Sequence, residues 1–453
     1  MTIPRATQVP MAAISVTGTP SISDTGDHVL DTSRPLDVAR GTTSAGLLAR
    51  HMPALDALLN VPGFLQLCVS NGLAQAFGTR LQTLMVAWLV LEMTDSKIWL
   101  GLINGAPAIS IVLFSLVGGV MADSRAPRRL LMLTRVMLAV TSLTAAVLIA
   151  CGLIRLEYLV VYMLFVFGLA AVDMPVARTL THQVAGSAGL LSATSTQSVF
   201  TGLFNMTGPL IIGVLITHTG ASSSFGVLVA GYVLAVLLLR KTHSPVTASQ
   251  PERGSRPLAD LSAAIRYIRS TPTVATLAGL GFLLPVAGVY FAMVPVYARD
   301  ILRVDATGLG LLAASFAAGS LLSSSYLAAS GKMRHRGIAI ALLGVAFGAG
   351  MIAFALSKSF LVSSGVSLGM GVIAGLWQNT LSTLVQLAAA PEMRGRVVAV
   401  FTMGFQMVGV GWLICGVLGT LVGVEATLVL SGCVFSAVSV GAAVLVASVR
   451  RID

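Results

Sequence analysis

The chain has 453 residues, of which 56% are apolar and 10% are charged, and its formal net charge is +11. Soluble domains carry about a quarter charged residues, so this composition excludes an ordinary soluble protein and indicates a polytopic membrane protein. The basic residues lie in short loops between apolar segments rather than on one polar face. They therefore indicate orientation in a membrane and argue against binding to nucleic acid.

Residues 1–60 begin with a stretch rich in Ser, Thr, Pro and Asp and are predicted to form a largely disordered cytoplasmic tail. After this tail, windows of about twenty apolar residues predict twelve helices long enough to cross a bilayer. The predicted spans are 63–93, 97–122, 128–151, 156–180, 189–217, 221–240, 272–299, 307–330, 336–357, 359–386, 394–423 and 426–449. The predicted fold class is thus an all-α integral membrane protein.

A long polar connection between the sixth and seventh spans, from Arg240 to Pro257, divides the chain into two halves. The residues after it show helical apolar spacing and predict a short amphipathic helix on the membrane surface. The predicted domains are a six-helix bundle over 61–240, a cytoplasmic linker over 241–271, a second six-helix bundle over 272–449 and a tail over 450–453.

Sidedness follows from the Lys and Arg residues in the connections. Seventeen of them fall on the side of the long linker and five fall on the other side. Because cytoplasmic loops are enriched in Lys and Arg, both termini are predicted to be cytoplasmic. We expect a multi-pass protein of the cell (inner) membrane.

Two six-helix halves joined by a cytoplasmic linker resemble the major facilitator superfamily, and a basic loop after the second span carries this resemblance in detail. The segment from Gly119 to Arg129 is similar to the superfamily's signature between helices two and three, and Ser330 to Arg336 is a weaker echo in the second half. The resemblance implies a gate at the cytoplasmic ends of the helices. Its expected residues are Gly119, Asp123, Arg125, Arg128, Arg129, Glu392, Arg394 and Arg396.

In this superfamily the acid of the signature lies beside the start of helix eleven. Asp123 would accept hydrogen bonds from N–H groups there, and Arg125, Arg128 and Arg129 would pair with Glu392. Such contacts would hold the cytoplasmic ends together while the outside is open, and separate when the inside opens. The alternative is that these arginines only orient the helices and bind lipid headgroups.

Three further segments narrow the resemblance to the multidrug and siderophore efflux branch, which includes enterobactin exporters. They are WLVLEMTDS at 88–96, PEMRGRVVAVF at 391–401 and the run Gly208, Pro209 to Gly213. The last is similar to the proton-antiporter motif of helix five. The resemblance implies a secondary transporter that expels small amphipathic molecules in exchange for protons.

Charged residues within the predicted spans are few, and each one normally faces a cavity or a partner. We expect Arg80 in the first span and Asp173 in the fourth to form a pair in a central cavity, with Asp173 carrying the proton. The alternative is that Asp173 pairs locally with Arg178 and is structural. Asn205 stands where relatives commonly carry an arginine, so the positive charge of helix five is expected to have moved to helix one.

Uncharged residues complete the expected cavity. Tyr290 and Trp377 are predicted to line an apolar site, and Gln406 to supply a hydrogen bond there. Polar side chains also join helices inside membranes, so Gln406 has packing as its alternative. Aromatic residues can likewise serve as interface anchors.

The sequence contains no GxxxxGK[ST], so ATP is not expected as the energy source. It also lacks HExxH and clusters of Cys or His, so we expect no enzyme activity, no catalytic residues, no metal site and no cofactor. The expected partners are a small-molecule substrate, protons and the lipid bilayer. An uptake carrier, a lysophospholipid flippase of the same fold and a non-transporting membrane sensor remain as alternatives.

Overall fold

The computed structural model describes residues 63–122, 126–242, 257–330 and 336–445, all within one compact unit over Leu47–Asp453. The predicted tails 1–60 and 450–453, most of the polar linker, Asp123 and Arg125 lie outside these residues. The domain boundaries at 61–240, 241–271 and 272–449 stay predictions. We refer to α3–α8 as the first half and to α10–α17 as the second half.

The first half is helical at each of its predicted spans. The first span is one continuous run of α-, π- and α-helix, and the fourth and fifth spans form the long helix α7, which breaks at Gly186 (φ 64°). A positive φ there is readily adopted by glycine. The elements are α3 (Phe64–Gln75), η1 (Ala76–Leu81), α4 (Gln82–Thr94), α5 (Lys97–Ala122), α6 (Pro127–Ala150), α7 (Leu156–Thr219) and α8 (Ala221–Arg240).

The second half repeats this order after a short helix, α9, at the position of the predicted amphipathic segment. The seventh span is interrupted at Phe282 and Leu283, just before Pro285, because proline cannot donate to the helix ladder and clashes with the preceding turn. The elements are α9 (Pro257–Ser270), α10 (Pro272–Gly281), α11 (Leu284–Val296), η2 (Tyr297–Ile301), α12 (Ala306–Ser330), α13 (Arg336–Leu356), α14 (Phe360–Ala388), α15 (Arg394–Gln406), α16 (Val408–Leu421) and α17 (Val424–Leu445).

Length and hydropathy identify the membrane-crossing helices. Among the described residues, ten helices are long and apolar enough to cross a membrane, and they match the third to twelfth predicted spans. The first two predicted spans, 63–93 and 97–122, are helical along their described length. The chain therefore crosses back and forth between two ends. We call the end where α8 finishes and α9 begins the linker end, and the opposite end, where α4 finishes and α5 begins, the distal end.

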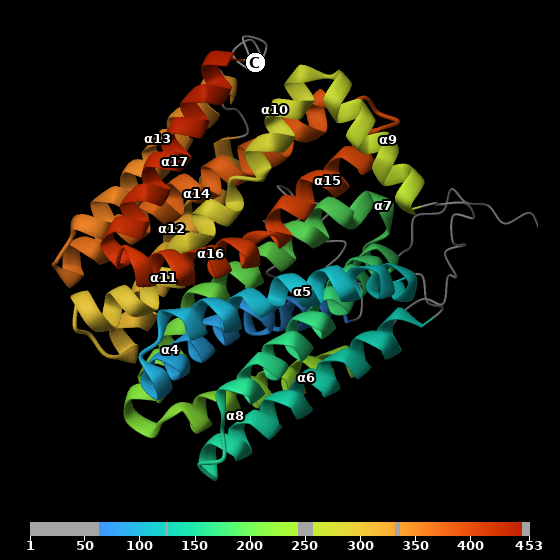
Figure 1. Ribbon diagram of the computed structural model, residues 1–453. Helices are drawn as coiled ribbons and strands as arrows, with labels where there is room; N and C mark the ends of the chain where they lie inside the picture. The colour runs from blue at the N-terminus through green and yellow to red at the C-terminus, as the bar shows by residue number, and fades with distance from the viewer. Residues whose placement is uncertain (1–62, 123–125, 243–256, 331–335, 446–453) are drawn as a thin grey trace, which may run out of the picture. The chain divides into compact units, whose positions relative to one another are not determined.

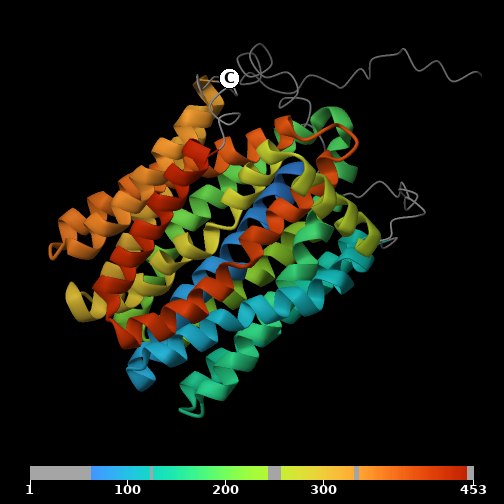
Figure 2. The ribbon, with the colours of Figure 1, turned by 45° about the horizontal axis from the view of Figure 1, so that its top comes forward.

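The two halves meet along α5 with α16 and along α7 with α12, while α6 with α8 and α13 with α17 pack within their own halves. Figures 1 and 2 both show α5 running beside α16. Glycines permit this contact, because a Cβ on Gly101 would lie 2.7 Å from the Cα of Gly416 and a Cβ on Gly310 would lie 2.4 Å from the carbonyl oxygen of Pro209. These close approaches lie toward the distal end.

Candidate functional site

A cavity of about 430 Å³ lies between the two halves, lined by residues of both. Four of the predicted cavity residues, Arg80, Asn205, Tyr290 and Trp377, are in its lining, together with Pro209 of the antiporter-like motif. Gln406 is the last residue of α15, and its side chain is outside the described part of the structure. The cavity is strongly aromatic. Its aromatic lining residues are Phe167, Tyr290, Phe291, Phe316, Phe347, Trp377, Trp412 and Phe435.

Arg80 reaches the cavity from the π-helix η1, a type of helix that is often found at functional sites. Its side chain is exposed, and its guanidinium carbon lies 5.4 Å from the centre of the Phe291 ring. A cation over an aromatic face at this distance is held by the ring's quadrupole. The contact joins the first half to the second, because Phe291 belongs to α11.

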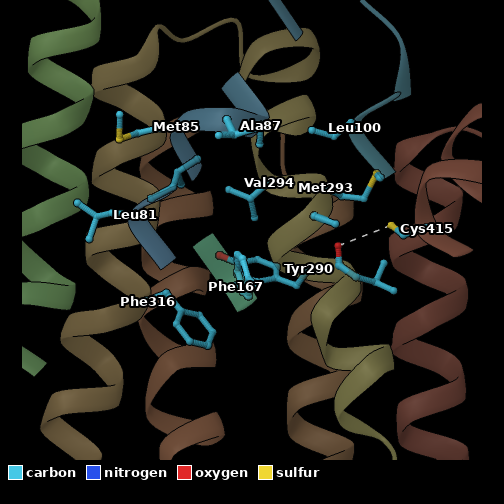
Figure 3. Packing of buried hydrophobic residues seen from close by; sticks show 14 of the residues in the cluster. Leu81, Met85, Ala87, Leu100, Phe167, Tyr290, Met293, Val294, Phe316 and Cys415 are labelled. Atoms are coloured by element: carbon cyan, nitrogen blue, oxygen red, sulfur yellow. Dashed lines mark hydrogen bonds between the residues drawn. The ribbon is translucent and has the colours of Figure 1, made fainter. Parts of the chain in front are cut away.

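One wall of the cavity is a packed aromatic cluster of α11 and α12. The rings of Tyr290 and Phe316 stack with centres 5.5 Å apart, and Phe291 meets Phe316 edge to face at 4.9 Å. The Tyr290 hydroxyl donates a hydrogen bond to Ser367 Oγ at 2.8 Å, which fixes the ring against α14. Figure 3 shows Tyr290 and Phe316 within the buried cluster, where Cys415 donates to the backbone of Val289. Aromatic pairs of this kind form a rigid apolar surface.

Two polar atoms of lining residues have no hydrogen-bond partner among the described residues. They are Oδ1 of Asn205 on α7 and Nε1 of Trp377 on α14. Buried polar atoms are almost always paired, so these two buried atoms are exceptions to that rule.

Asp173 forms an ion pair that the sequence analysis did not anticipate. Its Oδ1 lies 3.3 Å from Nε of Arg135, a residue of α6 that is completely buried. The expected pairing of Asp173 with Arg80, and the alternative with Arg178, are therefore corrected: the partner is Arg135. Arg80 instead lies against Phe291, and Arg178 is exposed.

Neutral side chains form further hydrogen bonds with both members of this pair. Arg135 also donates to Ser70 Oγ at 2.5 Å and to Asn71 Oδ1 at 2.6 Å, while Thr134 donates to Asp173 at 2.8 Å. Asn71 continues the network by donating to Thr181 at 3.2 Å. Charges inside a membrane are costly unless they are paired and hydrogen-bonded, and this network supplies both. It joins α3, α6 and α7 on the linker-end side of the cavity.

Arg135 met the same criterion that singled out Arg80 and Asp173, since it is an ionisable residue inside a predicted apolar span. That signal is present in the sequence. What the sequence does not show is which of several charged residues face one another, because that depends on how the helices are rotated.

The predicted cytoplasmic gate is only partly described. Gly119 lies in α5, and Arg129, Glu392, Arg394 and Arg396 are exposed at the linker end. Arg128 does not pair with Glu392 as expected. It donates instead to the carbonyl oxygens of Leu239 at 2.9 Å and Arg240 at 2.5 Å, at the end of α8. A cation at a helix C-terminus is favoured by the helix dipole and by the unpaired carbonyl groups there.

The antiporter-like motif lies on the second segment of α7. A Cβ on Gly208 would lie 2.8 Å from Leu81 of η1, and a Cβ on Gly213 would lie 2.4 Å from the carbonyl oxygen of Ala306. Both glycines therefore allow close packing, Gly208 against the first span and Gly213 against α12 of the other half. Pro209, between them, lines the cavity.

A second ionic contact closes the distal end. Arg299 of η2, in the second half, donates to the carbonyl oxygen of Leu91 at 2.6 Å and to the carboxylate of Asp95, both in the first half. It also donates to Asp300 at 2.8 Å. The sequence analysis assigned no role to Arg299. We call this contact the distal clamp.

Known proteins share features with this chain. The sequence profile of the family described as transmembrane secretion effector matches residues 58–453. The multidrug efflux pump Tap of Mycolicibacterium fortuitum is 27% identical over 391 residues, which cover 81% of this chain and 91% of the pump. The enterobactin exporter EntS of Citrobacter koseri is 24% identical over 245 residues, covering 54% of this chain and 57% of the exporter. The match thus spans less than two thirds of that exporter's length.

Solved structures resemble the chain at the level of the fold. The nucleoside transporter NupG superimposes with a TM-score of 0.66 at 15% identity, covering 85% of this chain and 99% of NupG. A bacterial homologue of the human lysosomal transporter Spinster gives a TM-score of 0.65 at 16% identity, covering 88% and 97%. Identities this low show the fold alone, and the fold class predicted from the sequence is confirmed.

Proposed function

Since the chain belongs to the transmembrane secretion effector family of the major facilitator superfamily, it is a multi-pass membrane transporter and not an enzyme, and we propose that it exports small amphipathic molecules in exchange for protons. The proposal specifies the direction of transport, the coupling ion and the class of substrate. The resemblance to a multidrug efflux pump and to a siderophore exporter supports the direction.

The observation that carries the proposal is a cavity between two halves that touch closely at one end. At the distal end, the Gly101–Gly416 contact and the distal clamp of Arg299 with Asp95 join the halves. Among the described residues, Glu392 at the linker end makes no ion pair with the arginines of the other half. With both termini in the cytoplasm, as the positive-inside rule favours, we infer that the linker end is cytoplasmic and that this conformation faces inward.

In the proposed cycle the ends close alternately. Opening of the distal end breaks the distal clamp and separates Gly101 from Gly416, while the cytoplasmic gate residues Asp123, Arg125 and Glu392 come together. The binding site stays between the halves throughout. The substrate therefore has access to one side of the membrane at a time.

Proton coupling is assigned to the pair of Asp173 and Arg135. A proton bound by Asp173 removes its negative charge, which leaves Arg135 as an uncompensated buried cation and favours a rearrangement of α6 against α3. Arg135 is hydrogen-bonded to Ser70 and Asn71 of α3, and α3 runs directly into η1, which carries Arg80. Movement of α3 thus connects the proton site to the cavity.

Flux measurements on the full chain in proteoliposomes test the proposal. Vesicles loaded with a dye or a siderophore are placed in an acidic bath, and efflux is followed for the wild type and for Asp173→Asn. We expect acid-driven efflux in the wild type, and in Asp173→Asn only the downhill flux that does not respond to the pH gradient. The exposed acid variant Glu425→Gln is the matched control and should behave like the wild type. Gradient-driven efflux that persists in Asp173→Asn would place the coupling site elsewhere.

A further inference from the structure

The described lining of the cavity carries positive charge only. Of the residues that line it in the described part of the chain, Arg80 is the only one with a charged side chain, and none is an aspartate or glutamate. An arginine stays protonated in proteins, so the lining carries a permanent positive charge. A cationic ligand would meet repulsion from this charge and find no carboxylate to offset it.

Arg80 differs from the other internal arginines in how its guanidinium is used. Arg135 is neutralised by Asp173 and hydrogen-bonded to α3, Arg299 is held by Asp95 and Asp300, and neither is in the cavity lining. Arg80 has no ion pair with a described residue, and its guanidinium lies over the Phe291 ring. Its N–H donors are therefore available to an anion.

The surroundings of Arg80 favour an aromatic ligand. The ring it covers belongs to the cluster of Phe291, Phe316 and Tyr290, which presents apolar faces to the cavity. A flat ring bound against this cluster gains offset or edge-to-face contacts.

We propose that the cavity binds aromatic anions, with the carboxylate, sulfonate or phenolate of the ligand on the Arg80 guanidinium and its ring against Phe291 and Phe316. The inference rests on the proposed function, because it names the substrate class of that transport cavity. A guanidinium forms strong charge-assisted hydrogen bonds with an anionic group. The positive charge, rather than size alone, then selects the ligand.

Equilibrium binding of three matched probes tests the inference on the full chain in nanodiscs, with empty nanodiscs as the background. The probes are naphthoate, naphthamide and the naphthylmethylammonium ion, which share one ring system and differ in charge. The wild type should bind naphthoate at least about tenfold more tightly than either of the others, as expected for a hydrogen bond to a charged group. Weaker or equal binding of naphthoate, or no saturable binding of it, would overturn the inference.

Substitutions of Arg80 assign the selectivity to that residue. Arg80→Gln should lose the preference for naphthoate, Arg80→Lys should keep much of it, and Arg80→Glu should favour the ammonium probe. Arg155→Gln, which removes an exposed arginine outside the cavity lining, is the matched control and should bind like the wild type. Unchanged selectivity in Arg80→Gln would contradict the proposal.

The failure of this inference can be told apart from the failure of the proposed function. Arg80-dependent binding of naphthoate without acid-driven efflux would leave the substrate class standing and remove proton-coupled export. Acid-driven efflux of a cationic dye, with binding that Arg80→Gln does not change, would remove the proposed substrate class and leave proton-coupled export standing.

Discussion

The two halves share a layout but differ in the chemistry of their interiors. In each half a buried hydrogen bond joins the first and fourth helices: Tyr162 donates to Gln82 at 2.9 Å in the first half, and Tyr290 donates to Ser367 at 2.8 Å in the second. The first half adds the ion pair of Arg135 with Asp173. Among the described residues of the second half no such buried ion pair occurs, and stacked aromatic rings of α11 and α12 lie in its interior.

This difference indicates a division of labour. The first half buries a charged pair, and the second half supplies an aromatic wall to the cavity. Arg80 connects the two, because it belongs to the first half and lies against Phe291 of the second. The substitutions below alter each side of the comparison in turn.

The largest effect is expected from breaking the buried ion pair. Arg135→Leu leaves the Asp173 carboxylate without its cation, and loss of one partner of a buried pair typically costs about 3–5 kcal/mol. Replacing both residues by leucine should recover part of that loss, since no buried charge remains. Thermal unfolding in nanodiscs compares the wild type, Arg135→Leu, Asp173→Leu and the double variant. A double variant as unstable as the two single changes added together would show that the pair is not a coupled unit.

A smaller effect on stability, with a clear effect on conformation, is expected at the contact between the halves. Gly101→Leu places a side chain where even a Cβ would lie 2.7 Å from Gly416, so the distal end cannot close as it does here. Forcing extra atoms into such a contact costs about 1–3 kcal/mol. A thiol introduced by Asn205→Cys should become more reactive toward an impermeant reagent added from the distal side.

The matched control is Gly226→Leu in α8, where the added side chain would meet open space. It should leave the labelling rate unchanged. If Gly101→Leu labels at the same rate as this control, the distal contact does not govern access to the cavity.

The smallest effect is expected from removing the two equivalent hydroxyls. Tyr162→Phe and Tyr290→Phe should each destabilise by about 1 kcal/mol, the usual net value of one hydrogen bond. Tyr162→Phe should cost more, because the buried Oε1 of Gln82 then loses its hydrogen-bond donor, while the amide nitrogen of Gln82 still donates to Tyr232. Chemical or thermal unfolding compares them. A larger loss for Tyr290→Phe would mean that the aromatic wall depends on its hydroxyl more than the polar half does.

Much of this architecture could be predicted from the sequence because length and hydropathy decide which segments cross a bilayer. The third to twelfth spans are recovered in this way. Arg80, Asn205, Tyr290 and Trp377 line the cavity, and their role in transport stays a prediction. The pairing of charged residues could not be predicted, because the partner of Asp173 depends on how the helices are rotated. For the same reason the sequence does not show that Arg128 hydrogen-bonds to the carbonyl groups at the end of α8. The π-helix that carries Arg80 has no signal in the hydropathy pattern that we can identify.

The central claim is that Asp173, paired with Arg135, carries the transported proton. A pH-sensitive dye trapped inside proteoliposomes tests it most directly, because it reports proton movement when a substrate gradient is applied to the full chain without an imposed pH gradient. The account predicts substrate-driven proton movement in the wild type and none in Asp173→Asn, with substrate exchange retained in both. Proton movement of wild-type size in Asp173→Asn would contradict it.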